Sequence, residues 1–323
     1  MRIIEPVTIA PDMAVLGDFE VMPDSAPLVV KPGQTFRVAS VMTNVPENDY
    51  ALWVSGKAYA IGERVMLEHR AYEALVAHSN RNPTGAATDP PTWLDLGPTN
   101  RWRMFDDKIG TETVNPESIA LKMMPGRAVD SLAFFGLDAA SLYVRVVDPY
   151  QGIVYESSVS PVSTDGINDW YDYFFSPVEV NEDFVLLDVP VGSYGSIDIQ
   201  ISKPGGIARV GALIMGKAAV LGEALYGTSV GITDYSRKER DDFGNMVIVE
   251  RGYSKRAEFD VMVQTGMVSQ VQRTLSKYRA QPLVWIGAAE YQSTILYGYY
   301  KEFNLVISGP TVSDCSISVE GLI

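Results

Sequence analysis

Two stretches of this chain alternate between aliphatic and other side chains with a period of two. In residues 142–147, LYVRVV, and in residues 197–202, IDIQIS, every second residue is Leu, Val or Ile. Successive side chains of a β-strand point to opposite faces of its sheet, so this period predicts strands with one buried face. Turn-forming clusters such as VDPYQG, STDGIND and SKPGG are typical of the connections between strands. The chain is therefore expected to fold mainly into β-sheets.

One segment carries a helical pattern instead. In GMVSQVQRTLSKYRAQP, residues 266–282, the apolar positions expected to share one helical face are Val268, Val271, Leu275 and Tyr278. Thr265 is the predicted N-cap, and Pro282 is the predicted stop. The helix lies between two predicted strands, AEFDVMV and PLVWIGA, and two more follow, STILYGYYKEFNLVIS and SDCSISVEGLI. This order predicts a strand-rich α+β unit with one helix.

The chain of 323 residues is too long for one average domain. Its patterns divide it into four parts: an extended leader of β character (1–46), a small aromatic module (47–105), a β-sandwich of short strands with polar turns (106–225), and the strand-rich unit (226–323).

Charge and cysteine usage exclude several classes of protein. The net charge is −14, and a surface this acidic repels phosphate backbones, so nucleic acid is not an expected partner. No apolar run approaches the length of a membrane span. Glu5 and Pro6 interrupt the N-terminal apolar residues, so no secretory signal is predicted. The single cysteine, Cys315, excludes an internal disulfide and a cysteine metal cage.

One literal catalytic motif is present. Residues 227–231, GTSVG, match the G-x-S-x-G pattern of hydrolases, with Ser229 as the nucleophile. That chemistry needs a strand before the serine, a helix after it and a later histidine as base. No histidine follows His78, so a glycine-flanked turn is the favoured interpretation.

Metal ligation is equally poorly supported. His69 and His78 are nine residues apart, which is not a helical pairing, so both are interpreted as surface or loop residues. Asp165, Asp169 and Asp172 could hold calcium, but aromatic residues alternate with them, which favours a solvated, partly packed loop. We therefore expect no enzyme, no metal site and no cofactor.

The aromatic module carries a resemblance. Its order of residues is Trp53, then YAIGERV from Tyr59 to Val65, then Tyr72-Glu73-Ala74, then Pro83 and Trp93. This order resembles the small chitin-binding-type carbohydrate-binding modules, with Glu63 in place of the usual Asp and Glu68-His69-Arg70 in place of an Asn-Gly type turn. The resemblance implies a small three-stranded sheet whose exposed aromatic rings stack on sugars.

That resemblance makes candidates of five aromatic residues, Trp53, Tyr59, Tyr72, Trp93 and Trp102. Indole offers a large rigid face to the apolar side of a sugar. Yet a domain of this size without disulfides must bury aromatic rings to be stable, so Tyr59 and Tyr72 are expected to fill the core. Two roles for the module stay open. At least one of its tryptophans stacks on a sugar, or the module only connects other proteins as an adaptor; we favour the adaptor role.

The rest of the chain resembles bacteriophage tail proteins. NRWRMFD (100–106) follows the module as it does in tail-tip and fibre proteins, and the next region is similar to galactose-binding-like jelly rolls. The C-terminal part, from GITDYS through DFGN to SISVEGL, resembles tail-tip proteins related to the distal tail family, whose core echoes the tail-tube fold.

This second resemblance implies a non-enzymatic virion component of the tail tip or baseplate, made in the host cytoplasm. Such a protein forms a homo-oligomeric ring around the tail axis, contacts other tail proteins, and presents its outer domains to fibres or host-surface glycans. The alternative is a free carbohydrate-binding protein of a bacterial cell surface, against which the missing secretion signal counts.

Overall fold

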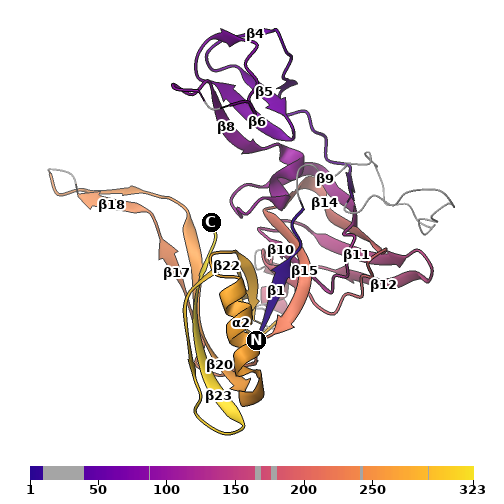
Figure 1. Cartoon of the computed structure of the whole chain (residues 1–323), viewed down its shortest axis with the longest axis vertical. Coiled ribbons are helices and arrows are strands. Elements are labelled where there is room, and N and C mark those ends of the chain that lie inside the picture. The colour runs from indigo at the N-terminus through magenta and orange to yellow at the C-terminus, as the bar shows by residue number, and fades with distance from the viewer. Residues whose placement is uncertain (10–39, 87, 164–168, 176–179, 241–242, 290) are drawn as a thin grey trace.

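The computed structural model describes residues 1–9, 40–86, 88–163, 169–175, 180–240, 243–289 and 291–323. Most of the expected leader (1–46) and Asp165 lie outside these residues. The mainly β prediction is confirmed, since strands make up 53% and helices 10% of the structure. Figure 1 shows a narrow module at the top, formed by residues 51–98, above a larger body.

A ten-stranded antiparallel sheet, curled into a half-barrel, organises the body. Its path runs through β13 (Phe184–Leu186), β10 (Ser131–Phe135), β15 (Ala212–Val220), β1 (Arg2–Pro6), β21 (Leu283–Ile286), β22 (Ile295–Val306), β23 (Val312–Gly321), β20 (Tyr253–Gln264) and β16 (Glu223–Ala224), with β17 (Ser229–Asp234) also paired to β20. The N-terminal strand lies at the centre of this path, because Ile3 pairs with Ala219 on one side and with Trp285 on the other. One sheet therefore runs through both the expected sandwich and the expected C-terminal unit.

A second sheet covers one end of the large one. Its strands are, in order, β12 (Gly152–Val159), β11 (Ser141–Asp148), β14 (Ser196–Val210), β9 (Thr113–Met124) and β2 (Ser40–Thr43). The two alternating stretches of sequence are β11 and β14, and Val144 and Ile199 on them pack with Phe134 and Leu213 of the large sheet. These predicted strands, with their buried aliphatic face, are confirmed.

The same face of the large sheet also carries the helix. Residues directly paired across an antiparallel ladder share a face, and the period of two places Ile3, Leu213 and Trp285 on one side. Toward β15 this side packs on the second sheet, and toward β21 it packs on α2 (Val268–Lys277). Val271 and Leu275 of α2 are buried there, as the helical pattern predicts.

The predicted ends of this helix are wrong. Thr265 opens a 3-10 turn, η2 (Thr265–Met267), and Met267 is the N-cap residue of α2. The hydroxyl of Thr265 lies 3.0 Å from the carbonyl oxygen of Gly309 and 3.0 Å from the hydroxyl of Ser313, so it holds a neighbouring loop instead of capping. The helix ends at Lys277, before Pro282 can act as a stop.

The opposite face of the large sheet is also covered in its middle. Ile4, Phe135, Ile214, Val284 and Tyr297 form a cluster there, on strands from both ends of the sequence. Because both faces of the sheet are buried there, β21 (LVWI) and β10 (SLAFF) read in sequence as nearly continuous apolar runs.

The module is built from two small sheets. One has the order β3 (Ala51–Leu52), β5 (Arg64–Leu67), β6 (Arg70–Ala74) and β8 (Trp93–Pro98); the other pairs β4 (Ala58–Tyr59) with β7 (His78–Ser79). The expected three-stranded sheet thus has a fourth strand, since β3 adds a parallel edge to β5. The 3-10 helix η1 (Asn100–Phe105) connects the module to the body.

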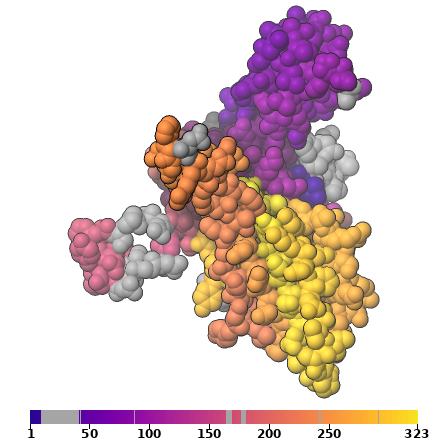
Figure 2. All heavy atoms as spheres, turned by 90° about the vertical axis from the view of Figure 1, so that its left-hand side faces the viewer, coloured from indigo at the N-terminus to yellow at the C-terminus, as the bar shows by residue number. Residues whose placement is uncertain are grey.

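Two elements protrude from the body. The hairpin of β18 (Arg237–Arg240) and β19 (Met246–Val249) extends beyond β17 and β20 (Figure 1). The short helix α1 (Trp170–Phe175) stands away from the rest of the molecule (Figure 2). Asp169 caps α1, because its side chain accepts a hydrogen bond of 2.9 Å from the Asp172 N–H. The loop expected around Asp169 and Asp172 is therefore partly helical.

Candidate functional site

Two of the five candidate aromatic residues form the core of the module. Tyr59 and Tyr72 are 2% and 6% exposed, and they pack with Val65 and Ala74. The hydroxyl of Tyr59 accepts a hydrogen bond of 2.7 Å from the Val54 N–H and donates one of 3.1 Å to the Val54 carbonyl. Both rings are thus held inside the module, where they offer no face to a sugar.

Trp93 lies at the edge of this core. Its ring is edge-on to Tyr59 and to His78, with centroid distances of 5.3 and 4.7 Å. Its indole N–H donates to the carbonyl oxygen of Arg81 at 3.0 Å, which fixes the ring's orientation. The ring also lines an open hollow of about 500 Å³, whose other walls include Asn82, Pro83, Gly85, Thr88 and Thr92. Trp93 is the candidate whose ring the structure places at a hollow of ligand size.

The two other tryptophans lie elsewhere. Trp53 is half-buried against the module core, and among the described residues its indole nitrogen has no hydrogen-bond partner. Trp102 is 3% exposed and belongs to the core of the body, beside Phe105. The five candidates therefore do not form one surface.

His78 has an apolar role in the same core. Both of its ring nitrogens are buried without a hydrogen-bond partner among the described residues. Burial, helped by the charge of Arg81, holds the pKa of His78 below its ordinary value. His78 is half-buried on β7, and its ring packs against Tyr59 and Trp93 with centroid distances of 5.8 and 4.7 Å. It is therefore a partly exposed strand residue with buried ring nitrogens, whereas a surface or loop histidine was expected.

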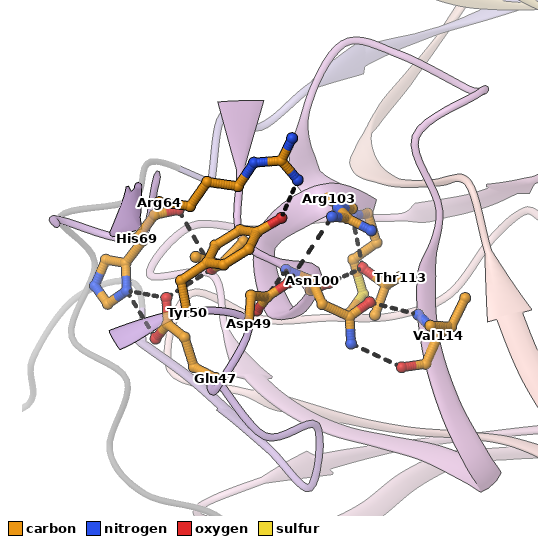
Figure 3. Close-up of polar contacts among 11 residues, drawn as sticks. Glu47, Asp49, Tyr50, Arg64, His69, Asn100, Arg103, Thr113 and Val114 are labelled. Atoms are coloured by element: carbon orange, nitrogen blue, oxygen red, sulfur yellow. Dashed lines mark hydrogen bonds and ion pairs between the residues drawn. The ribbon is translucent and has the colours of Figure 1, made fainter. Parts of the chain in front are cut away.

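His69 holds the module on the body through the unusual turn seen in the sequence (Figure 3). Glu68 and His69 both have positive φ, 51° and 64°, which is the geometry of a type I′ turn that Asn-Gly adopts more easily. The His69 Nδ1 lies 2.9 Å from a carboxylate oxygen of Glu47, and the Thr99 hydroxyl donates to the same oxygen at 2.6 Å. The His69 ring also packs on Trp102 at 4.9 Å.

A second set of bonds completes this junction (Figure 3). The backbone N–H of Asn100 donates to Asp49 at 3.1 Å. The Asn100 amide side chain both donates to and accepts from the backbone of Val114, at 2.8 and 2.9 Å, as a neighbouring strand would. The Arg101 guanidinium donates to the Val45 carbonyl at 2.6 Å. So many polar bonds in one place fix the angle between module and body. Nothing in the sequence pattern of Glu47 or Asn100 marks this role.

The hydrolase motif has no catalytic geometry. Ser229 begins strand β17 and pairs with Glu258, so a strand follows the serine where the motif needs a helix. It borders an open concavity of about 450 Å³ that also contains Asp260 and Glu302. His69 and His78 are engaged inside the module and its junction, as described above.

Other kinds of site were sought in the same way. Within the described ranges, no group of three or more His, Cys, Asp or Glu residues could hold a metal ion. In that part of the chain, no helix is long and apolar enough to cross a membrane.

Large apolar side chains are exposed on both protruding elements. We call the described residues of 235–252 the arm; on its strand β19, Met246 and Ile248 are 57% and 63% exposed, and Val247 and Val249 are nearly as open. On α1 all five aromatic residues are exposed, from 63% at Tyr173 to 77% at Trp170. Contiguous exposed apolar surface of this kind marks interaction sites in soluble proteins.

Comparison of the chain with protein-family models gives no match, and comparison with curated proteins finds no relative.

Proposed function

We propose that this chain is a non-enzymatic structural protein that assembles with copies of itself, as a component of a phage tail tip or baseplate. The observation that carries the proposal is the arm. A two-stranded hairpin is at best marginally stable in water by itself, and this one exposes four consecutive aliphatic residues, Met246 to Val249. Such a hairpin gains stability when another chain covers it.

The architecture is compatible with the finer folds that the sequence resemblance implies. The two facing sheets, with β11 and β14 in one and β10 and β15 in the other, support a jelly-roll interpretation of the central region. In the C-terminal region β20, α2 and β21 follow one another along the chain, with α2 packed on their sheet. This order supports the relation to a tail-tube core.

The test of assembly is the size of the purified chain at micromolar concentration. Sedimentation velocity should give discrete oligomers, and Met246→Ser with Ile248→Ser should shift them toward monomer. Mass spectrometry of purified phage particles should detect the chain. A stable monomer at every concentration, or particles that lack the chain, would contradict the proposal.

A second function is supported by one observation, the hollow beside Trp93. Trp93 lines this hollow together with the polar residues Arg81, Asn82 and Thr92, and an indole ring beside polar groups is suited to a sugar ring. In this alternative the chain, whether in a virion or free at a bacterial cell surface, binds glycans through Trp93. The five-residue site expected from the resemblance is then reduced to one aromatic contact.

A glycan array separates the sugar-binding role from the adaptor role. The assembled wild type is compared with Trp93→Ala and with Trp53→Ala, and circular dichroism serves as the folding control. Binding that is lost in folded Trp93→Ala but kept in Trp53→Ala supports the hollow as a sugar site. No binding by the well-folded wild type leaves the module as an adaptor, rigidly mounted through His69 and Glu47.

A further inference from the structure

A cavity of about 220 Å³ lies where two distant parts of the curled sheet approach each other. Phe135, at the end of β10, and Asp183, just before β13, line it from one part. Lys255 of β20, Tyr297 of β22 and the end of β23 line it from the other. In the order of the sheet, β13 and β10 come first and second, whereas β22, β23 and β20 come sixth to eighth. A molecule in this cavity therefore contacts strands that do not pair with each other.

The walls of the cavity are mainly apolar and aromatic. The rings of Phe135 and Tyr297 stack with their centroids 5.7 Å apart, and both residues are buried. The Tyr297 hydroxyl is already engaged, because it donates to Asp107 at 2.9 Å. Tyr253 and Ile323, which also line the cavity, are about half exposed, so the cavity is open to solvent at that side. An aromatic ring fits such walls, since aromatic pairs gain from offset or edge-on contact.

One ion pair supplies the polar groups of this cavity. The Lys255 ammonium donates a hydrogen bond to the Asp183 carboxylate. Asp183 is 6% exposed, and Lys255 is half-buried. Burial raises the pKa of Asp183, although the charge of Lys255 acts in the opposite direction. Apolar pockets with a few convergent polar groups, one of them a buried acid with a specific charge partner, are typical of ligand-binding sites.

The ion pair favours an uncharged ligand with a hydroxyl group. Asp183 and Lys255 neutralise each other, so a charged ligand group would be buried there without a counter-charge. A hydroxyl can donate to the carboxylate and accept from the ammonium at the same time. Glu182, an exposed residue of the lining, further disfavours anions. An apolar cavity of about 150 Å³ holds benzene, so this cavity has room for one ring with a small substituent.

We propose that the cavity binds a small uncharged phenol. The ring of the ligand lies against Phe135 and Tyr297, and its hydroxyl bonds to Asp183 and Lys255. Because the ligand contacts strands from two distant parts of the sheet, its binding stabilises the curled form. This inference goes beyond the assembly function proposed above and does not depend on it.

The experiment titrates the full chain with small aromatic probes, followed by saturation-transfer difference NMR. Phenol should bind about tenfold more tightly than toluene, which has the same size and no hydroxyl, because a hydrogen bond to a charged group contributes about that factor. Benzoate and benzylamine should bind more weakly than phenol. The thermal unfolding midpoint, measured by circular dichroism, should rise as phenol is added.

Variants at Gly110 test the location of the site. A Cβ added at Gly110 would lie 3.7 Å from the carbonyl carbon of Ile323, which is an ordinary contact between two residues of the lining. Gly110→Phe should therefore obstruct the cavity and weaken phenol binding by about tenfold or more, because close-packed walls leave no spare room. Gly110→Ala is the matched control and should bind as wild type does. Trp93→Ala, at the other aromatic hollow, should also leave phenol binding unchanged.

A double variant tests the role of the ion pair. Asp183→Leu with Lys255→Met replaces both charged groups by apolar groups of similar size, a change that proteins often tolerate. Toluene should still bind, and the preference for phenol over toluene should fall from about tenfold to about one.

Each contrary result overturns a stated part of the proposal. A folded wild type that does not bind phenol refutes the site, and unchanged phenol binding in folded Gly110→Phe refutes its location. If Gly110→Phe does not fold, the double variant decides, because a preserved preference for phenol refutes the ion pair as the binding group. Tighter binding of benzylamine or benzoate shows that the ligand class is wrong. Sedimentation velocity measures assembly separately, so these results leave the assembly function untouched.

Discussion

The module and the body bury their side chains on very different scales. The module has a core of four buried residues, two of them tyrosines, with Trp53 and Trp93 at its edge. The body has three clusters on the two faces of one ten-stranded sheet. A small domain cannot bury enough area with aliphatic residues alone, so it uses aromatic rings. Most aromatic residues in such a module therefore stabilise its core, and few remain exposed to bind a ligand.

The largest expected effect lies in the body. Trp285 is fully buried, and its indole N–H donates to the Gly298 carbonyl at 3.0 Å. Trp285→Ala should lower the free energy of unfolding by about 3–5 kcal/mol, because it leaves a large cavity. Urea denaturation followed by circular dichroism measures this. Tyr226→Ala, at a fully exposed ring, is the control and should change stability by less than about 0.5 kcal/mol.

A substitution in the module should have a more local effect. Tyr59→Ala removes the centre of the small core and should cost about 3 kcal/mol, enough to open residues 51–98 while the body stays folded. Limited proteolysis with mass spectrometry should show cuts confined to the module. Tyr59→Phe, which loses only the hydrogen bonds to Val54, should cost about 1 kcal/mol. Equal loss of protection in the body would show that the junction couples the two parts.

Lowering the pH should destabilise the module more than the body. Because the pKa of His78 is lowered in the folded module, the fold favours the neutral ring. This contribution to stability is complete above the unfolded pKa of about 6.5 and is lost as the pH falls below it. The urea midpoint of the module's amide signals in NMR spectra should fall between pH 7.5 and pH 5.5 more than that of the body. His78→Phe should abolish the difference, whereas His69→Gln should keep it.

The smallest effect concerns the strained turn. Glu68 has φ of 51°, a conformation that asparagine tolerates better than glutamate. Glu68→Asn should raise the stability of the module by less than about 1 kcal/mol without changing the body. Glu68→Gln, which keeps the unfavourable side chain, should have no effect. A loss of stability in Glu68→Asn would mean that the Glu68 side chain has a favourable role of its own.

The elements that follow a simple period were predictable. β11, β14 and the buried side of α2 follow from alternation or helical spacing, because burial on one face imposes those periods. The N-cap of α2 was not predictable, because Thr265 forms its hydrogen bond with a loop that is distant in sequence. The central position of β1 was also not predictable, because both of its partners lie more than two hundred residues away.

The candidate site was predictable only in outline. The resemblance nominated five aromatic residues, but burial depends on which strands pair, so it could not separate Trp93 from Trp102. The junction between Glu47, His69 and Thr99 joins three segments whose sequences have no common pattern. The cluster WYDYFF was visible in the sequence, yet its exposure on a short helix depends on the body leaving it uncovered.

The central position of β1 also has a consequence for synthesis. The ribosome makes Ile3 about 280 residues before Trp285, its second partner. At about 5–20 residues per second, β1 waits roughly 15 to 60 s for that strand, and the half-barrel cannot close earlier. During this time the edge of β1 that pairs with β21 is open to other nascent chains. The module, whose strands all lie within residues 51–98, has its whole fold available once residue 98 has been synthesised. Slower translation thus lengthens the time for which the body has an unpaired strand edge, and it leaves the module unaffected.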